Sequence, residues 1–217
     1  MERENSLRER LIDVGVDLVM TDGTTSLGLR EIARRAGVSH GAPRRYFPTH
    51  HSLLSAIARR GFTDLEVRFA AATDSAMSAR AQLQGIGRAH VRYALEHRGM
   101  FELMFRHDLL DSERHPPDQS QLRDSTLPMF ELMVELVVRL RTEQAAERRP
   151  GAPSDPPPPA VTAAALWSNL HGLAQLWAWG SLQLALNAVP PGGASDDSHL
   201  DQLVAAVLDA HLGPVTS

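Results

Sequence analysis

The sequence contains no cysteine, which excludes disulfide bonds, thiolate metal sites and cysteine nucleophiles. It has no run of 18 or more apolar residues, and no apolar signal segment follows the charged stretch "MERENSLRERL". Gly-rich phosphate loops, Gly-x-Ser-x-Gly and His-Glu-x-x-His are also missing. We therefore expect a cytoplasmic protein with no membrane partner, no cofactor, no metal site and no catalytic residue.

Lysine is absent as well, and the arginines that replace it are unevenly distributed. Seven of the 22 arginines lie between residues 28 and 60, where Glu31 is the single acidic residue. The rest of the chain has 15 arginines and 25 acidic residues. A compact basic segment on an acidic chain is typical of a module that binds a polyanion, with a solvated helix face as the alternative.

Helical periodicity extends along almost the whole chain, and strand signals are nearly absent. This pattern predicts an all-α fold of about nine helices. We expect helices over 7–22, 29–36 and 39–46 (with Ser39 as N-cap), from Thr49 onward, and over 81–97, 100–110, 122–149 (starting irregularly near Pro128), 160–188 and 199–212 (capped by Asp196 or Asp197). The stretch "DSERHPPDQSQ" reads as a loop, and the Pro-rich segment at 142–160 as a flexible linker.

Residues 29–47 have the spacing of a helix-turn-helix. Ala33 is small enough to let the next helix pack closely, and Gly37 can take a positive φ at the sharp turn. Apolar Val38 and Phe47 flank the following segment. The helix expected at 39–46 would then present its N-terminal face to the major groove of DNA. The alternative is an ordinary corner between two helices of a helical enzyme.

The side chains around this turn suit contacts with DNA. Arg44 and Arg45 can bond to guanine edges or straddle phosphates. The first turn of the expected helix comes closest to the bases, and the start of the next helix attracts a phosphate. The Tyr46 hydroxyl suits a phosphate oxygen, although the ring could instead be half-buried. The predicted DNA-binding residues are Arg30, Arg34, His40, Gly41, Arg44, Arg45, Tyr46 and His50.

The stretch "LREIARRAGVSHGAPRRYFPTHHSLLSAI", residues 29–57, resembles the DNA-binding domain of TetR-family transcriptional regulators. The resemblance implies a helix-turn-helix domain over 1–51 and an all-α effector-binding and dimerisation domain over 52–217. It further implies a homodimeric, ligand-responsive repressor that binds a pseudo-palindromic operator. The family's DNA contacts fall on all of the predicted DNA-binding residues except Arg34. The sequence departs from the family at Gly28, where Thr or Ser is common, and at Arg44 and His50, where an aromatic residue and lysine are common. A small helical enzyme and a helical binding protein that does not bind DNA are the alternatives.

The segment "ALWSNLHGLAQLWAWG", residues 165–180, is apolar on more than one helix face. Such a helix must bury one face inward and another against a partner, which favours a homodimer. The segment also resembles the Trp…His-Gly helix of one class of TetR-family C-terminal domains, in which two long helices pair with their twofold mates.

An apolar effector would bind among methionine and aromatic side chains of the helical body, although the same residues suit an ordinary core. The predicted pocket residues are Phe101, Met104, Phe105, Met129, Phe130, Met133, Trp167 and His171. A metal-sensing site from His90, His97 and His107 is a less favoured alternative to hydrogen-bonded or surface histidines.

Overall fold

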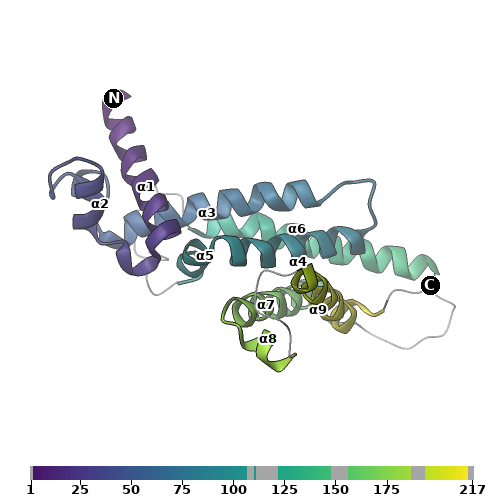
Figure 1. The fold of residues 1–217 in the computed structure, drawn as a ribbon. Helices are drawn as coiled ribbons and strands as arrows, with labels where there is room; N and C mark the ends of the chain where they lie inside the picture. Colours follow the sequence, from purple (N-terminus) through teal and green to yellow (C-terminus); the bar gives the residue numbers. More distant parts are fainter. Residues whose placement is uncertain (1, 107–109, 111–121, 148–155, 187–193, 215–217) are drawn as a thin grey trace. The chain divides into compact units, whose positions relative to one another are not determined.

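The computed structural model describes residues 2–106, 110, 122–147, 156–186 and 194–214, which form nine α-helices and two 3₁₀ helices without a strand (Figure 1). The elements are α1 Glu2–Asp22, η1 Thr24–Ser26, α2 Leu29–Arg35, η2 Pro43–Arg45, α3 His50–Ala72, α4 Ala79–Glu96, α5 Arg98–Met104, α6 Leu122–Glu147, α7 Pro159–Ala178, α8 Ser181–Ala185 and α9 Ala194–Leu212. The predicted all-α fold is confirmed. None of the helices in these ranges is long and apolar enough to cross a membrane.

The chain divides into two compact units. Unit 1 comprises Met1–Asp64 and Glu96–Thr126, and unit 2 comprises Leu65–Leu95 and Leu127–Ser217. Helix α3 contributes residues to both units, and the domain boundary predicted at residues 51 and 52 lies in its first turn.

The core of unit 1 brings α1 together with α2, α3 and α5. Leu11 and Leu18 of α1 are fully buried, as is Ile32 of α2. Gly99 lies against the carbonyl oxygen of Val19, where a Cβ atom would collide with the backbone. The helices expected over 81–97 and 100–110 leave Gly99 between them, but Gly99 is the second residue of α5 and the helices separate at residue 97. The absence of a side chain at Gly99 lets α5 pack closely against α1, and the glycine does not break the helix.

Unit 2 is organised around α4, α7 and α9. Helices α7 and α9 lie side by side (Figure 1). Gly87 of α4 fits against both of them, since a Cβ atom there would lie 3.1 Å from Val204 and 3.2 Å from Leu170. Leu170 and Val204 are themselves fully buried. The close packing of these three helices builds the core of unit 2.

Several predicted boundaries are wrong, because packing and single turns override local propensity. Helix α6 runs through Pro128, with Met129 and Met133 buried in the turns that follow. Helix α7 stops before Gly180, whose φ of 78° ends it before the short α8.

Helix α9 begins at Ala194, so neither Asp196 nor Asp197 is its cap. Residues 142–147 of the predicted linker are helical, while 148–155 and the predicted loop at 111–121 lie outside the described residues. Helix α5 ends at Met104 rather than at residue 110.

Candidate nucleic-acid interface

A left-handed glycine ends α2 as predicted. Gly37 has a φ of 68°, and its N–H donates to the Arg34 carbonyl at 3.2 Å. The Val38 N–H donates to the Ala33 carbonyl at 3.0 Å. These two bonds form a Schellman motif, which satisfies the last carbonyls of α2 and turns the chain sharply. Ala33 is fully buried, in agreement with its expected role as a close-packing position.

The α-helix predicted at 39–46 is not present. The segment instead forms a turn and the short 3₁₀ helix η2, with bonds from the Ala42 N–H to Ser39 and from the Arg45 N–H to Ala42. An α-helix capped at Ser39 would need the N–H of residue 43 to bond to the Ser39 carbonyl, and Pro43 has no N–H. Proline therefore costs this segment its first α-type bond, and the tighter 3₁₀ pattern replaces it.

The segment is anchored by apolar side chains and exposes its polar ones. Pro43 and Phe47 are buried, whereas Arg44 and Arg45 are exposed. His40 and Gly41 are exposed as well, and Tyr46 is half-buried, which was the predicted alternative for its ring. The two adjacent arginines are thus available to a ligand outside unit 1.

The start of α3 is held by a reciprocal cap and by a histidine. The Ser52 N–H donates to Thr49 Oγ1 at 3.0 Å, and the Thr49 N–H donates to Ser52 Oγ at 3.2 Å, so Thr49 caps the helix as predicted. His50 Nε2 donates to the Leu27 carbonyl oxygen at 2.5 Å. His50 therefore connects α3 to the loop before α2, which sequence reasoning did not anticipate.

An acidic residue neutralises part of the positive charge of α2. Arg34 forms a bidentate pair with Glu31, at 2.8 and 2.6 Å, and Arg35 donates to the same carboxylate at 2.9 Å. Arg35 also donates to Asp22 at 2.8 Å. The hydrogen bonds from Arg34, and then those from Arg35, lower the pKa of Glu31 to about 2. Arg30, by contrast, is exposed and forms no ion pair with the described residues.

The N-terminus of α2 has no side-chain cap. Gly28 occupies the N-cap position with an extended backbone, and it has no side chain that could accept a hydrogen bond from the first turn. The Ser26 hydroxyl donates to the carbonyl oxygen of Gly23 at 2.7 Å, and the carbonyl oxygen of Leu18 in α1 lies 3.3 Å away. The first N–H groups of α2 therefore remain open to an anion from outside, as at other uncapped helix N-termini.

Arg8 is a further basic residue near this surface that sequence reasoning missed. Its guanidinium lies 5.4 Å from the centroid of the Phe47 ring, in a cation–π contact. Burial lowers the pKa of Arg59, and the nearby charge of Arg8 lowers it further. The distance in sequence between Arg8 and Phe47 explains why no local pattern revealed the contact.

The predicted pocket residues fall into the two units. In unit 1 the rings of Phe101 and Phe105 lie 4.9 Å apart, and Met104 is fully buried against Gly61 of α3. In unit 2 the Trp167 ring lies 6.4 Å from Phe69. Met129 and Met133 are buried, while Phe130, Trp167 and His171 are half-buried.

Two histidines of unit 2 meet beside Trp167. The fully buried His90 ring lies 4.5 Å from the Trp167 ring and 5.8 Å from the His171 ring. Burial lowers the pKa of His90 to about 3, with a smaller effect from His171, and burial also lowers the pKa of His171. Both imidazoles are therefore neutral near pH 7. His107 lies outside the described residues, and His97 belongs to unit 1.

Comparison with known proteins identifies two domains. Residues 11–57 match the family described as "Bacterial regulatory proteins, tetR family". Residues 83–203, more than half of the chain, match "Tetracyclin repressor-like, C-terminal domain". This second segment contains Trp167, His171 and Gly172. A comparison with the sequences of curated proteins finds no significant match.

Solved structures share the fold over nearly the whole chain. A Rhodococcus sp. RHA1 protein of unknown function is 29% identical, with a TM-score of 0.67 and coverage of 95% of this chain and 93% of that one. A TetR-like transcriptional regulator from Rhodococcus sp. RHA1 is 18% identical, with a TM-score of 0.60 and coverage of 94% of both chains. RolR in complex with resorcinol is 17% identical, with a TM-score of 0.59 and coverage of 97% and 89%. The chain belongs to the TetR family, and it is a transcriptional regulator with a DNA-binding helix-turn-helix domain rather than an enzyme.

Proposed function

We propose that the chain is a homodimeric, ligand-responsive repressor that acts in the cytoplasm on a pseudo-palindromic operator. Each protomer would place the segment at 39–46 in a major groove, with the two segments about 34 Å apart on the DNA. An effector bound in the helical body would favour a dimer with a different separation and thereby lower operator affinity.

The exposed pair Arg44 and Arg45 carries the proposal. Both side chains belong to η2, and the buried Pro43 and Phe47 on either side of them fix the backbone. A guanidinium can donate two parallel bonds to a guanine edge, so an arginine on a fixed backbone can read sequence as well as charge. His40 and Gly41 would approach the bases, while Arg30, Arg34 and Tyr46 would contact phosphates.

A gel-shift experiment on the DNA upstream of the chain's own coding region tests the proposal. We expect Arg44→Ala and Arg45→Ala each to weaken specific binding by about 5- to 150-fold, the loss of one base contact. Arg92→Ala is the matched control, because Arg92 is equally exposed but lies on α4 in unit 2. Unchanged binding by both variants would contradict the proposed interface. No binding by the parent protein would show that the operator does not lie in this DNA.

The homodimer is supported by apolar side chains that unit 2 leaves exposed. On α7, Leu176 is 41% exposed. Trp179, which follows α7, is 58% exposed. Gly172 has open space around its missing Cβ, so another helix could approach the backbone closely there. Such a face is typical of a subunit interface.

The effector is proposed to be a small apolar molecule with hydrogen-bonding groups, held near Trp167, His171 and His90. Neutral imidazoles can donate to or accept from a hydroxyl, and the indole ring provides a stacking surface. The related fold of RolR was solved with resorcinol, an aromatic diol. A panel of phenols, added to the operator gel shift, tests the proposal. Release of DNA by an active phenol should be lost in Trp167→Ala but retained in Val67→Ala, which changes an exposed side chain of α3.

A further inference from the structure

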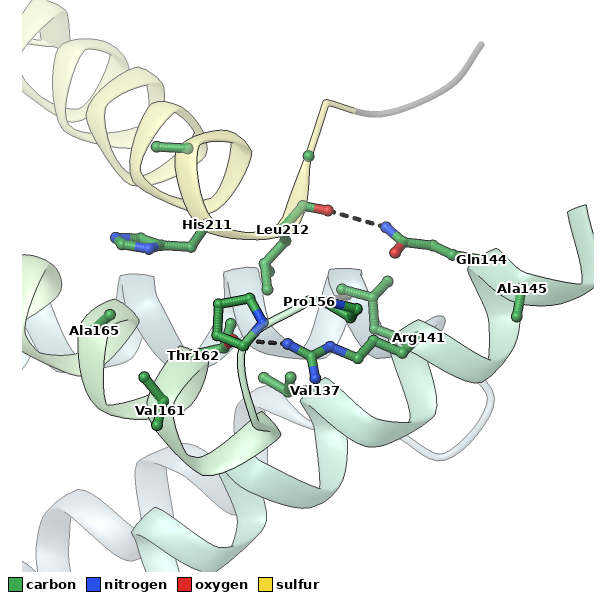
Figure 2. A pocket seen from close by; sticks show the side chains of 14 residues that line it. Val137, Arg141, Gln144, Ala145, Pro156, Val161, Thr162, Ala165, His211 and Leu212 are labelled. Carbon is green, nitrogen blue, oxygen red and sulfur yellow. Dashed lines mark hydrogen bonds between the residues drawn. The ribbon is translucent and has the colours of Figure 1, made fainter. Parts of the chain in front are cut away.

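Unit 2 contains a cavity of about 600 Å³ between the end of α6, the start of α7 and the end of α9 (Figure 2). Its volume lies within the range of about 300–1,000 Å³ that is usual for small-molecule sites. None of the eight predicted pocket residues lines it. The cavity is therefore separate from the site near Trp167 that we propose for the effector.

The walls of the cavity are mainly apolar, with one cationic side chain among them. Val137 and Leu140 of α6, Val161 of α7 and Leu212 of α9 provide apolar surface. Arg141 reaches from α6 toward Thr162 of α7 (Figure 2). No aspartate or glutamate occurs among the described lining residues. An apolar wall with a single positive charge is complementary to an apolar anion.

Arg141 differs from Arg139 and Arg88 of the same unit in having a hydroxyl, not a carboxylate, as its partner. Its Nη2 donates to Thr162 Oγ1 at 2.7 Å, and no carboxylate of the described residues forms an ion pair with it. Arg139, two residues earlier, pairs with Glu143 at 3.2 Å, and Arg88 pairs with Asp201 at 2.7 Å. The bond to Thr162 leaves further N–H donors of Arg141 for a ligand, and it fixes the guanidinium in the cavity.

The other polar groups of the lining are engaged with the protein. Gln144 Nε2 donates to the Leu212 carbonyl at 3.0 Å, which closes one side of the cavity by joining α6 to the end of α9 (Figure 2). His211 is bonded to Asn169 of α7. Arg141 is thus the side chain best placed to determine which ligand binds.

We propose that this cavity binds an organic carboxylate with an apolar body, such as a medium-chain fatty acid or an aromatic acid. The carboxylate would accept hydrogen bonds from Arg141, in the paired geometry that guanidinium and carboxylate groups favour. The apolar body would lie against Val137, Leu140 and Val161. The inference concerns binding to the protein alone and does not depend on DNA binding.

Isothermal titration of the full chain without DNA tests the inference. The probes are decanoate and 1-naphthoate, each compared with its neutral amide. We expect the carboxylates to bind at least about 10-fold more tightly than the amides, because a charge-assisted hydrogen bond is lost in the amides. Arg141→Gln should abolish this preference for carboxylates. Arg141→Lys, which keeps the positive charge but loses the paired N–H donors of the guanidinium, should reduce it. The control Arg139→Gln should leave it unchanged.

A variant that fills the cavity locates the site independently. Ala145→Trp changes an exposed rim residue and leaves Arg141 in place, so we expect it to fold normally and to lose carboxylate binding. Carboxylates that bind no better than amides, or binding that survives both Arg141→Gln and Ala145→Trp, would overturn the inference. Inorganic phosphate that competes as strongly as decanoate would also overturn it, since phosphate has no apolar body. If carboxylates bind only to a monomeric variant, a second copy of the chain occupies the cavity in the dimer, and this result would also overturn the inference.

Discussion

The imidazole of His50 donates from Nε2 to the carbonyl oxygen of Leu27, at 2.5 Å. The bond connects the first residue of α3 to the loop that precedes α2, on either side of the segment with Arg44 and Arg45. A hydrogen bond between these two points restrains the position of α2 relative to α3. His50, expected to contact phosphate, is thereby better placed to support the interface than to touch DNA.

We predict that His50→Gln, which retains an N–H donor, binds operator nearly as well as the parent protein, whereas His50→Ala binds about 3- to 10-fold more weakly. The loss follows from one hydrogen bond of roughly 0.5–1.5 kcal/mol. The readout is the dependence of operator affinity on salt. Loss of a positioning residue lowers the affinity equally at every salt concentration. Loss of a phosphate contact changes the slope of the logarithm of the affinity against the logarithm of the salt concentration by about 1. If this slope is reduced in both variants, His50 contacts a DNA phosphate.

The pairing of Glu31 with Arg34 and Arg35 yields a second prediction. Glu31→Gln removes the negative charge between these arginines, which frees Arg34 for a phosphate and leaves Arg35 paired with Asp22. We therefore expect several-fold tighter DNA binding and a salt dependence steeper by about 1. Glu102→Gln on α5 is the control, because Glu102 pairs with Arg98 in the same i,i+4 manner away from α2. An unchanged affinity for Glu31→Gln would mean that Arg34 does not reach the DNA.

The elements of the fold were largely predictable, because helical periodicity is a property of the local sequence. The helix expected over 7–22 and the turn expected at Gly37 are both present in the structure. Predicted helix boundaries were wrong where a residue contacts a distant part of the chain, or where a residue lacks a hydrogen-bond donor. Gly99 is required by the Val19 carbonyl of another helix, and the missing N–H of Pro43 replaces an α-helix by a 3₁₀ turn.

The sequence predicts which residue types form the candidate site but not which groups they bind. Arg44 and Arg45 are exposed, and their contact with DNA stays a prediction. The pairing of Arg34 with Glu31 is allowed by spacing, yet the sequence alone does not decide whether Arg34 faces Glu31 or a phosphate. The contact of Arg8 with Phe47 and the cavity around Arg141 depend on tertiary packing, so no local pattern indicates them.

The buried His90 should make the stability of the protein depend on pH. The unfolded chain takes up a proton near pH 6.5, but His90 in the folded protein, with its pKa lowered to about 3, does not. The contribution of His90 is therefore fully favourable above pH 6.5 and is lost progressively as the pH falls from 6.5 toward 3. The free energy of unfolding should decrease by up to about 1.4 kcal/mol per pH unit in this range.

Urea unfolding at pH 7 and pH 5 measures this dependence. His90→Gln is the test variant, because it cannot titrate and differs from the parent protein in slope regardless of its overall stability. We expect the decrease between the two pH values to be smaller in His90→Gln by roughly 2 kcal/mol, with a residual decrease from His171. An identical pH dependence in the two proteins would show that His90 is protonated in the folded state or accessible to water.

The exposed side chain of Leu176 on α7 provides a test of the proposed homodimer. In a twofold interface each substitution occurs twice, so Leu176→Glu would place two unpaired carboxylates in the contact. We expect the dissociation constant of the dimer to rise at least about 100-fold, from roughly 1.5 kcal/mol or more for each buried charge. The single chain should remain as stable as before, because Leu176 is already 41% exposed in it. Sedimentation velocity over a range of concentrations measures the change. Val67→Glu, at a position on α3 that is 62% exposed, should sediment like the parent protein. If Leu176→Glu also does so, α7 does not form the interface.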